Sequence, residues 1–348
     1  MSINIVLLPG DGVGPEVSAA TLSVLRAAQG MFGLDFSFEE KLFGGAAIDA
    51  VGDPLPEETL SACKSSDAIF LGAIGGPKWD QAPVRPEQGL LKLRQELGVF
   101  ANLRPLKVLS GLESFSPLRE NLVKGADIMI VRELTGGVYF GDRVEGNETA
   151  SDVCTYSRGE VERVARVAFE AAKGRGGRLT SVDKANVLAT SRLWRHTVTQ
   201  LHQREYADVD LHHQLVDSMA MKLITGPTEF DVVLTENMFG DILSDEASVI
   251  AGSIGLSPSA SLGASGPGLY EPIHGSAPDI AGQDKANPIG SILSAAMMLR
   301  HSLNLVEPAT AIENGVEAAL QNGLRTADLG GDTGCEEAAA IIAKSIGR

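Results

Sequence analysis

The sequence predicts an α/β fold built on a parallel sheet. Short apolar runs typical of buried strands alternate with helical patterns along the chain, and this alternation implies right-handed strand–helix–strand crossovers. Glycine is abundant, with 39 residues, as tight turns between strands and helices require. The chain of 348 residues is long enough to form two domains or one large α/β unit.

The first predicted element is a strand over residues 3–8, whose continuous apolar run indicates that both of its faces are covered. It ends in a glycine-rich turn over residues 9–16, and a helix follows to about residue 29. The turn does not match the dinucleotide fingerprint G-x-G-x-x-G, because its glycines stand at positions 10, 12 and 14 with Pro15 after them. We therefore interpret it as a tight strand-to-helix turn.

The alternation continues with a strand near residues 35–39, a helix over 56–64 and a strand over 68–71. An irregular stretch rich in Gly and Pro then covers residues 72–88, and loops of this length inside compact domains are usually functional. The remaining predicted elements are, in order, a helix over 89–97, strands over 100–105, 127–133 and 152–157, a helix over 158–173, a strand over 179–184, a helix to about 203, a strand over 231–235, a helix to about 251, and helices over 291–301, 309–320 and 334–345.

Several charged side chains stand at or near the ends of these elements. Arg132 and Lys184 end predicted strands, and ligands of open α/β sheets bind outside the carboxyl ends of strands. Asp241 and Asp245 are four residues apart on a predicted helix, so both carboxylates project from one face. Taken alone, such a pair is more often a solvated helix face than a site for a divalent cation. The strand over 152–157 alternates in period two, which indicates an exposed or inter-subunit strand.

Composition excludes several classes of protein. A net charge of −16 disfavours nucleic-acid binding, which favours a basic surface. No apolar run approaches the roughly 18–20 residues of a membrane span. Three scattered cysteines without a C-x-x-C motif argue against a disulfide framework or a zinc site and fit a reducing cytoplasm. The N-terminus lacks the basic segment of a signal peptide, so we expect a cytoplasmic protein.

Motifs along essentially the whole chain resemble the isopropylmalate/isocitrate dehydrogenase family of β-decarboxylating dehydrogenases. The most specific are GLLKLR at 89–94, FANLRP at 100–105, VRELTGGVYFG at 131–141, NMFGDILSD at 237–245 and HGSAPDIAG at 274–282. The resemblance implies a mostly parallel α/β fold that is not Rossmann, in agreement with the missing fingerprint. It also implies two domains: residues 1–99 with 252–348 bind the cofactor, and residues 100–251 bind substrate and metal and dimerise.

The reaction implied by the resemblance is oxidation of (2R,3S)-3-isopropylmalate by NAD⁺, followed by loss of CO₂ to give 4-methyl-2-oxopentanoate, a step in leucine biosynthesis. A dicarboxylate substrate favours bidentate arginine donors, although any one Arg alone is more often a surface ion pair. The resemblance assigns substrate binding to Arg94, Arg104, Arg132 and Asp217, with Leu90 and Leu91 around the isopropyl group.

Catalysis and metal binding are assigned by the same resemblance. Lys184 matches the general base and Tyr139 the proton donor, although the residues alone fit Tyr139 equally well as a core aromatic. Mg²⁺ or Mn²⁺ would act as a Lewis acid. Its predicted ligands are Asp217, Asp241 and Asp245.

NAD is the predicted cofactor. An acidic residue at position 279 can bind a ribose 2′-hydroxyl and repels a 2′-phosphate, which favours NAD over NADP. The loop over residues 75–88 resembles the family's nicotinamide-side segment, and the loop over 274–287 resembles its adenosine side. The resemblance assigns cofactor binding to Gly75, Gly76, Glu87, Asn186, His274, Gly275, Ser276, Ala277, Asp279, Ile280 and Asn287.

The expected partners are the small-molecule substrate and a second copy of the chain, without nucleic acid or membrane. The resemblance implies a homodimer in which Lys184 and Asp217 complete the neighbouring subunit's site. Two alternatives remain at this point. One is a malate or tartrate dehydrogenase of the same family, and the other is a non-catalytic regulatory subunit that binds the cofactor.

Overall fold

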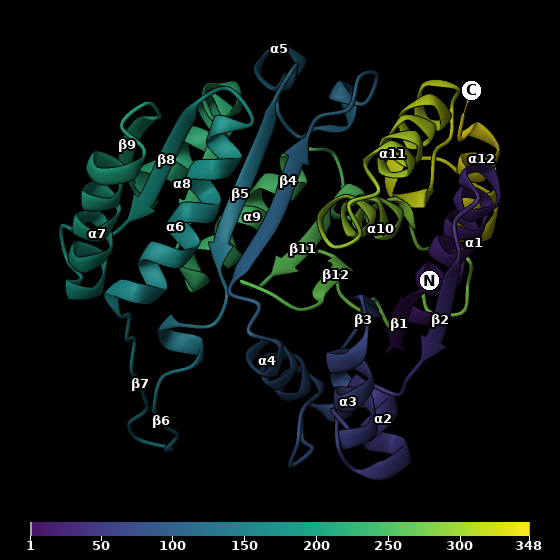
Figure 1. Cartoon of the computed structure of the whole chain (residues 1–348), viewed down its shortest axis with the longest axis horizontal. Helices are drawn as coiled ribbons and strands as arrows, with labels where there is room; N and C mark the ends of the chain where they lie inside the picture. The colour runs from purple at the N-terminus through teal and green to yellow at the C-terminus, as the bar shows by residue number, and fades with distance from the viewer. Residues whose placement is uncertain (1, 348) are drawn as a thin grey trace. The chain divides into compact units, whose positions relative to one another are not determined.

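A computed structural model describes residues 2–347 of the chain (Figure 1). The chain divides into two compact units, Met1–Val99 with Gly252–Arg348 and Phe100–Ala251. The first unit is therefore discontinuous in sequence, and the second is inserted into it. That the first unit binds the cofactor and the second binds substrate and metal remains a prediction.

The sheet of the first unit has the strand order β2-β1-β3-β12-β11. The first four of these strands are parallel, and β11 pairs antiparallel with β12. The strands are β1 (Ile3–Gly10), β2 (Phe36–Glu40), β3 (Ala68–Ala73), β11 (Pro258–Leu262) and β12 (Gly268–Pro272). The helices are α1 (Gly14–Phe32), α2 (Gly44–Val51), α3 (Glu57–Ser65), α4 (Pro86–Leu97), α10 (Ile289–His301), α11 (Val306–Gln321) and α12 (Cys335–Ser345), with 3₁₀ turns η1 (Pro77–Trp79), η5 (Ile254–Leu256) and η6 (Ala327–Leu329).

The core of the first unit follows from its apolar sequence runs. All six residues of β3 are buried, as expected for a strand covered on both faces. Helix α10 is buried over most of its length, α1 and α11 pack against it, and α12 packs against α1 and α11 (Figure 1). Helix α1 ends at Gly33, whose φ of 64° is the left-handed conformation that glycine adopts without steric cost.

The sheet of the second unit has the order β4-β5-β10-β8-β9, in which β4 is antiparallel to β5 and the other pairs are parallel. Its strands are β4 (Ala101–Lys107), β5 (Asp127–Glu133), β8 (Arg178–Asp183), β9 (Asp210–Leu215) and β10 (Val232–Thr235). Its helices are α5 (Glu120–Val123), α6 (Arg158–Lys173), α7 (Ala189–Glu205), α8 (Val216–Thr225) and α9 (Asn237–Ile250), with 3₁₀ turns η2 (Glu113–Phe115), η3 (Gly137–Tyr139) and η4 (Pro227–Glu229).

The sequence analysis did not predict α2, α8, β9 or β12, and two further segments differ from its expectation. The strand predicted over 152–157 is wrong in extent, because the structure forms a short antiparallel ladder between β6 (Arg143–Val144) and β7 (Ser151–Asp152). Residues 153–157 lie outside any strand, since the alternating pattern there meets no partner strand among residues 2–347. In the second case, β11 lies within the Gly/Ser/Pro-rich segment 255–268, for which no strand was predicted. Its small side chains are buried beside β12.

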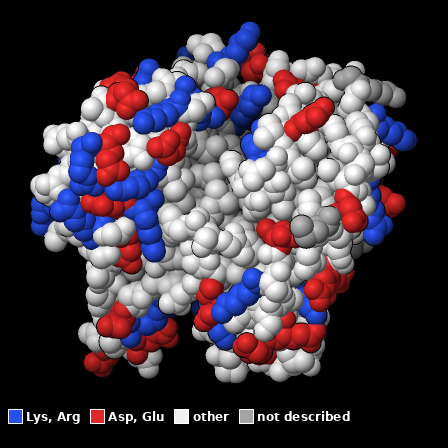
Figure 2. Space-filling model, viewed as in Figure 1, with Lys and Arg blue, Asp and Glu red and all other residues white. Residues whose placement is uncertain are grey.

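Charges on the surface of the second unit are mixed rather than separated. Over α6 and α7, basic and acidic side chains lie among one another in the face shown in Figure 2. Arg166 on α6, for example, lies 2.8 Å from Glu205 on α7. No helix in the described part of the chain is long and apolar enough to cross a membrane.

Candidate active site

The second unit brings together two arginines, two aspartates and a tyrosine that are far apart in sequence. Arg132 donates through Nη1 to Oδ1 of Asp241, and the Tyr139 hydroxyl donates to Oδ2 of the same carboxylate at 3.0 Å. Arg104 Nη1 lies 3.4 Å from Asp245 Oδ1, and its Nη2 lies 3.9 Å from Asp241 Oδ1. Five of the predicted site residues therefore form one cluster.

The pairing of β4 with β5 explains why the two arginines meet. In this antiparallel register Asn102 lies opposite Arg132 and Arg104 lies opposite Ile130, so both arginines project from the same face of the sheet. Helix α9 packs against β5 and β4 and carries both aspartates.

The apolar side of this packing continues away from the cluster. Ile128 and Ile130 of β5 share a buried core with Leu243, Ala247 and Ile250 of α9. The carboxyl end of β5 then replaces Ile with Arg132 at the next position on that face. This apolar packing sets the position of α9 along β5 and its rotation about its own axis. Asp241 and Asp245 therefore lie beside Arg104 and Arg132 on the same face of the sheet.

Asn237 fixes the direction of Arg132. Its Oδ1 accepts hydrogen bonds from Arg132 Nε at 3.1 Å and from Nη2 at 2.8 Å, and its Nδ2 donates to the Gly136 carbonyl at 3.1 Å. Asn237 begins α9, whose N-cap Glu236 accepts from the Phe239 amide at 2.8 Å. The sequence analysis did not single out Asn237 as a site residue, because nothing local to it signals a contact with a residue 105 positions away.

The electrostatics of the cluster follow from burial and crowding of like charge. Burial raises the pKa of Asp245, with the nearby Asp241 charge acting in the same direction. Burial and the Asp241 carboxylate raise the pKa of Tyr139 to about 12, so its hydroxyl stays protonated at neutral pH and can donate a proton or a hydrogen bond.

Lys184 and Asp217 form a second, separate pair. Lys184 follows β8, Asp217 lies in the first turn of α8, and Lys184 Nζ lies 2.6 Å from Asp217 Oδ1. This hydrogen bond lowers the pKa of Asp217. Asn186, another predicted site residue, is exposed two positions after Lys184.

The predicted metal ligands are only partly assembled within one chain. Among residues 2–347 no group of three or more His, Cys, Asp or Glu side chains is placed to hold a metal ion. Asp241 and Asp245 supply hard oxygen donors of the kind that Mg²⁺ and Mn²⁺ prefer, and a bound cation would offset the burial and the Asp241 charge that raise the pKa of Asp245. The donor set fits such an ion if further ligands come from substrate, water or a second chain.

In the first unit, Arg94 lies buried on α4. Its Nη2 lies 2.7 Å from Glu271 Oε1, while its buried Nε meets no hydrogen-bond partner within the described part of the chain. Leu90 and Leu91 are half-buried on the same helix, whereas Leu93 is fully buried. Helix α4 therefore keeps two apolar side chains outside its core-facing stripe, as a pocket for an alkyl group requires.

A cavity of about 390 Å³ in the first unit collects most of the predicted adenosine-side residues. Its lining includes five of them: His274, Gly275, Ala277, Ile280 and Asn287. The sequence analysis missed the cavity residues Val13, Ile254 and Asp328, which come from distant segments without a shared motif. One link is visible only in three dimensions: Asn287 Nδ2 donates to Asp328 at 3.0 Å, and Asn287 Oδ1 accepts from the Ile289 amide at the start of α10.

His274 presents an acceptor at this cavity. Burial lowers its pKa, so the ring is neutral, and Nδ1 must carry the proton because it lies 2.9 Å from the Gly275 carbonyl oxygen. Nε2 is then an acceptor, and it is buried without a hydrogen-bond partner among residues 2–347. A ligand hydroxyl or amine would satisfy this nitrogen.

The other predicted cofactor residues of the first unit lie in two loops and in the first turn of α4. Gly75 and Gly76 follow β3, and the Glu87 carboxylate of α4 lies against Gly75. Ser276 is buried, whereas Asp279 is exposed with its backbone carbonyl accepting from Gln283 Nε2 at 2.7 Å. The carboxylate of Asp279 is therefore presented to solvent.

Comparison with known proteins gives matches over the length of the chain. The family model described as isocitrate/isopropylmalate dehydrogenase matches residues 4–342. Proteins named 3-isopropylmalate dehydrogenase from Rhodopirellula baltica and Oleidesulfovibrio alaskensis are each 57% identical, covering 99% of both chains in the first case and 94% of both in the second.

Solved structures also match over nearly the whole chain. An isocitrate dehydrogenase from Methylococcus capsulatus matches with a TM-score of 0.89 at 32% identity, over 99% of this chain and 100% of that one. A β-decarboxylating dehydrogenase from Thermococcus kodakarensis matches with a TM-score of 0.82 at 40% identity, over 99% and 96%. These matches confirm the predicted mostly parallel α/β fold, which is not of the Rossmann type.

Proposed function

The chain belongs to the isocitrate/isopropylmalate dehydrogenase family, and from this premise we propose that it is an NAD-dependent 3-isopropylmalate dehydrogenase. It oxidises (2R,3S)-3-isopropylmalate and releases CO₂ to give 4-methyl-2-oxopentanoate, a reaction of leucine biosynthesis. The observation that carries the proposal is the cluster of Arg104, Arg132, Tyr139, Asp241 and Asp245, which joins anion-binding, cation-binding and proton-donating groups on one face of a sheet.

The arginines bind and orient the substrate. Arg104 and Arg132 are held in fixed directions by Asn102 and Asn237, so their guanidinium groups are preorganised for carboxylates. Arg94 contributes a third guanidinium on α4. Leu90 and Leu91 on that helix supply the apolar contact for the isopropyl group, where a relative acting on isocitrate must bind a further carboxylate.

Two residues of the chain move protons. Lys184 takes the proton of the substrate 2-hydroxyl. NAD⁺, when bound, would accept the hydride from C2. Tyr139, kept protonated by its raised pKa, gives a proton to C3 after the carboxylate there has left as CO₂. Asp241, Asp245 and Asp217 would hold a divalent cation, and when bound it would supply Lewis-acid stabilisation of the negative charge that develops on oxygen.

The residues lining the cavity at His274 would hold the adenosine side of NAD, and the loop at Gly75, Gly76 and Glu87 would hold its nicotinamide side. The exposed Asp279 carboxylate accepts from a ribose 2′-hydroxyl and repels a 2′-phosphate, which supports NAD as the preferred cofactor. Asn186 contributes to cofactor binding from the loop after Lys184.

We further propose a homodimer in the cytoplasm, with Lys184 and Asp217 completing the neighbouring subunit's site. Helices α8 and α9 expose large apolar side chains: Met221 and Ile242 are each 61% exposed, Val249 54% and Ile224 46%. Exposed apolar groups of this number on adjacent helices are typical of a surface that a partner covers. The hairpin of β6 and β7 would form an inter-subunit arm; it carries Val144, 61% exposed, and Val153 follows β7 at 47%.

Complementation tests the shared site. We expect Lys184→Ala and Arg132→Ala each to be inactive alone. After the two variants are mixed, dissociated and reassociated, we expect about one quarter of wild-type activity, because half of the dimers are hybrids and each hybrid has one of its two sites intact. Sedimentation of the wild type provides the control. No recovery from verified hybrids, or an active monomer, contradicts the proposal.

The test of the reaction is NADH formation with Mg²⁺, comparing 3-isopropylmalate, isocitrate, D-malate and tartrate, with NAD and NADP in parallel. We expect turnover to be led by 3-isopropylmalate with NAD and abolished by EDTA. Turnover led by malate or tartrate would preserve the chemistry and change the specificity. Binding of NAD without turnover of any substrate would indicate a regulatory subunit.

A further inference from the structure

The glycine-rich turn over residues 9–16 contacts three separate segments of the first unit. Asp11 is buried, and its carboxylate accepts three backbone hydrogen bonds: from Gly45 at 2.8 Å, Ala46 at 2.7 Å and Gly75 at 2.8 Å. Of these, Gly75 belongs to the predicted nicotinamide-side loop. The Asp11 side chain thus fixes the start of that loop from 64 residues away.

The middle of the turn holds the adenosine-side segment. The Val13 amide donates to the Ser276 carbonyl at 2.8 Å. A Cβ on Gly12 would lie 2.0 Å from the same carbonyl oxygen, so only glycine allows this approach. Val13 itself also lines the cavity at His274.

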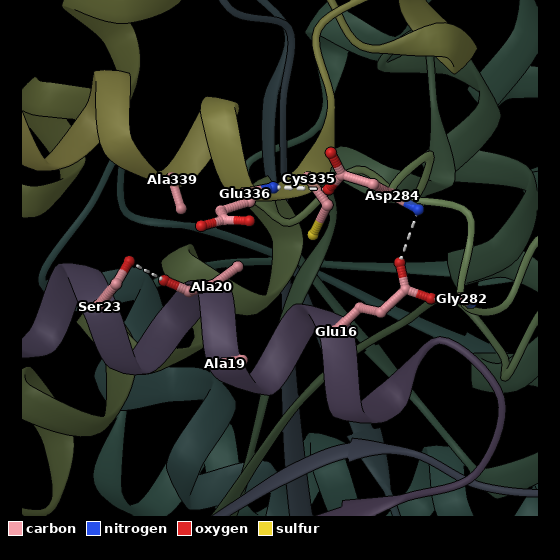
Figure 3. A pocket seen from close by; sticks show the side chains of 9 residues that line it. All are labelled: Glu16, Ala19, Ala20, Ser23, Gly282, Asp284, Cys335, Glu336 and Ala339. Atoms are coloured by element: carbon pink, nitrogen blue, oxygen red, sulfur yellow. Dashed lines mark hydrogen bonds between the residues drawn. The ribbon is translucent and has the colours of Figure 1, made fainter.

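The end of the turn contacts the adenosine-side segment at a second place, residues 282–284. Glu16 lies in the first turn of α1, and its carboxylate accepts from the backbone amides of Gly282 and, at 3.1 Å, Asp284. Figure 3 shows the Glu16 side chain reaching from α1 toward Asp284, whose own side chain turns to α12. There Asp284 Oδ1 accepts from the Glu336 amide at 2.9 Å.

We propose that the turn 9–16 is a positioning element that sets both cofactor loops at once: Asp11 acts on the loop at Gly75, while Val13 and Glu16 act on residues 276–284. A G-x-G-x-x-G motif contacts the dinucleotide directly. The turn 9–16 instead aligns the two loops that contact the cofactor. The inference rests on the proposed function only in that these loops bind NAD.

Glu16→Gln is the sharpest perturbation. The amide side chain has nearly the same shape but offers one acceptor oxygen to two backbone donors, so one amide of Gly282 or Asp284 faces an NH₂ group. We expect the Kd for NAD and for AMP, measured by calorimetry, and the KM for NAD to rise about five- to tenfold. This factor corresponds to the loss of one charge-assisted hydrogen bond, reduced because the site is partly exposed to solvent. The KM for 3-isopropylmalate and kcat should change less than about twofold.

Ser23→Ala is the matched control. Ser23 lines the same cavity of about 460 Å³ as Glu16, but its hydroxyl donates to the Ala20 carbonyl within α1. We expect it to leave NAD and AMP binding unchanged. All variants are measured well below their unfolding midpoints, so that a fall in stability does not mimic weaker binding.

The outcomes separate the two proposals. If wild type binds no NAD, the proposed function fails. If wild type binds NAD and Glu16→Gln binds NAD and AMP with unchanged Kd, the positioning role is wrong. Equal increases in the KM for NAD and for substrate would indicate a general structural effect and would also overturn it. A selective rise for NAD and AMP supports it.

Discussion

Replacing Arg132 with lysine tests the substrate clamp. Arg132 is 3% exposed, and its Nε and Nη2 donate to Asn237 at 3.1 and 2.8 Å. Lysine keeps the charge but lacks the planar fork, so it cannot make both bonds to Asn237 while it also contacts Asp241. At a net contribution of about 1.5 kcal/mol for each hydrogen bond to a charged group, the loss of two costs about 3 kcal/mol.

That loss corresponds to about a hundredfold if it falls on the placement of the guanidinium for the transition state. We therefore expect kcat/KM for 3-isopropylmalate to fall about a hundredfold, with the Kd for NAD unchanged. Steady-state kinetics measures the first, calorimetry the second, and urea unfolding reports any share of the 3 kcal/mol that appears as lost stability.

Arg166→Lys is the matched control. Arg166 lies on α6 of the same unit, in a partly exposed pair with Glu205, and surface pairs contribute at most about 1 kcal/mol. We expect its kinetics to equal those of wild type. If Arg132→Lys keeps kcat/KM within about threefold of wild type, a clamp that depends on the fork geometry is refuted.

Three further variants test other parts of the site. Tyr139→Phe should lower kcat by about 10²–10⁴-fold while leaving NAD binding intact, because the raised pKa keeps the hydroxyl as the proton donor; unchanged kcat in stopped-flow and steady-state assays would remove that role. Leu90→Ser with Leu91→Ser should shift the ratio of kcat/KM for 3-isopropylmalate over D-malate down by at least about tenfold, and a constant ratio would place the isopropyl pocket elsewhere. Asp279→Lys with Ile280→Tyr should erode the preference for NAD over NADP, measured as the ratio of kcat/KM values, and unchanged selectivity would count against Asp279 as the discriminating residue.

Local chemistry allowed most of the individual elements to be predicted. The helix predicted over 158–173 forms at Arg158–Lys173, because Ser157 and Glu160 make a capping box and the apolar positions repeat with helical spacing. The close pair of Asp241 and Asp245 was likewise visible, since four residues make slightly more than one helical turn. The whole-chain motifs led to the family, which the comparisons confirm.

Other predictions failed where the deciding contact was not local. The period-two pattern at 152–157 indicates a strand but does not say which strand would pair with it. In the structure the pairing extends only from Ser151–Asp152 to Arg143–Val144. By contrast, β11 has a sequence that resembles a loop and becomes a strand because β12 supplies its hydrogen bonds. Strand formation depends on a neighbouring strand, whereas a helix satisfies its own backbone.

The sequence by itself determined the strand–helix alternation, the absence of a Rossmann fingerprint and the residue types that a dicarboxylate, a divalent cation and NAD require. Only the tertiary structure decided which of these residues meet. Arg132 reaches Asp241, 109 residues later, because β5 and α9 share one apolar core, and the turn 9–16 reaches Ser276 and Asp284 because the chain returns to the first unit after residue 251. Periodicity and capping act over a few residues, while these contacts depend on strand order and on a discontinuous domain, which no local pattern encodes.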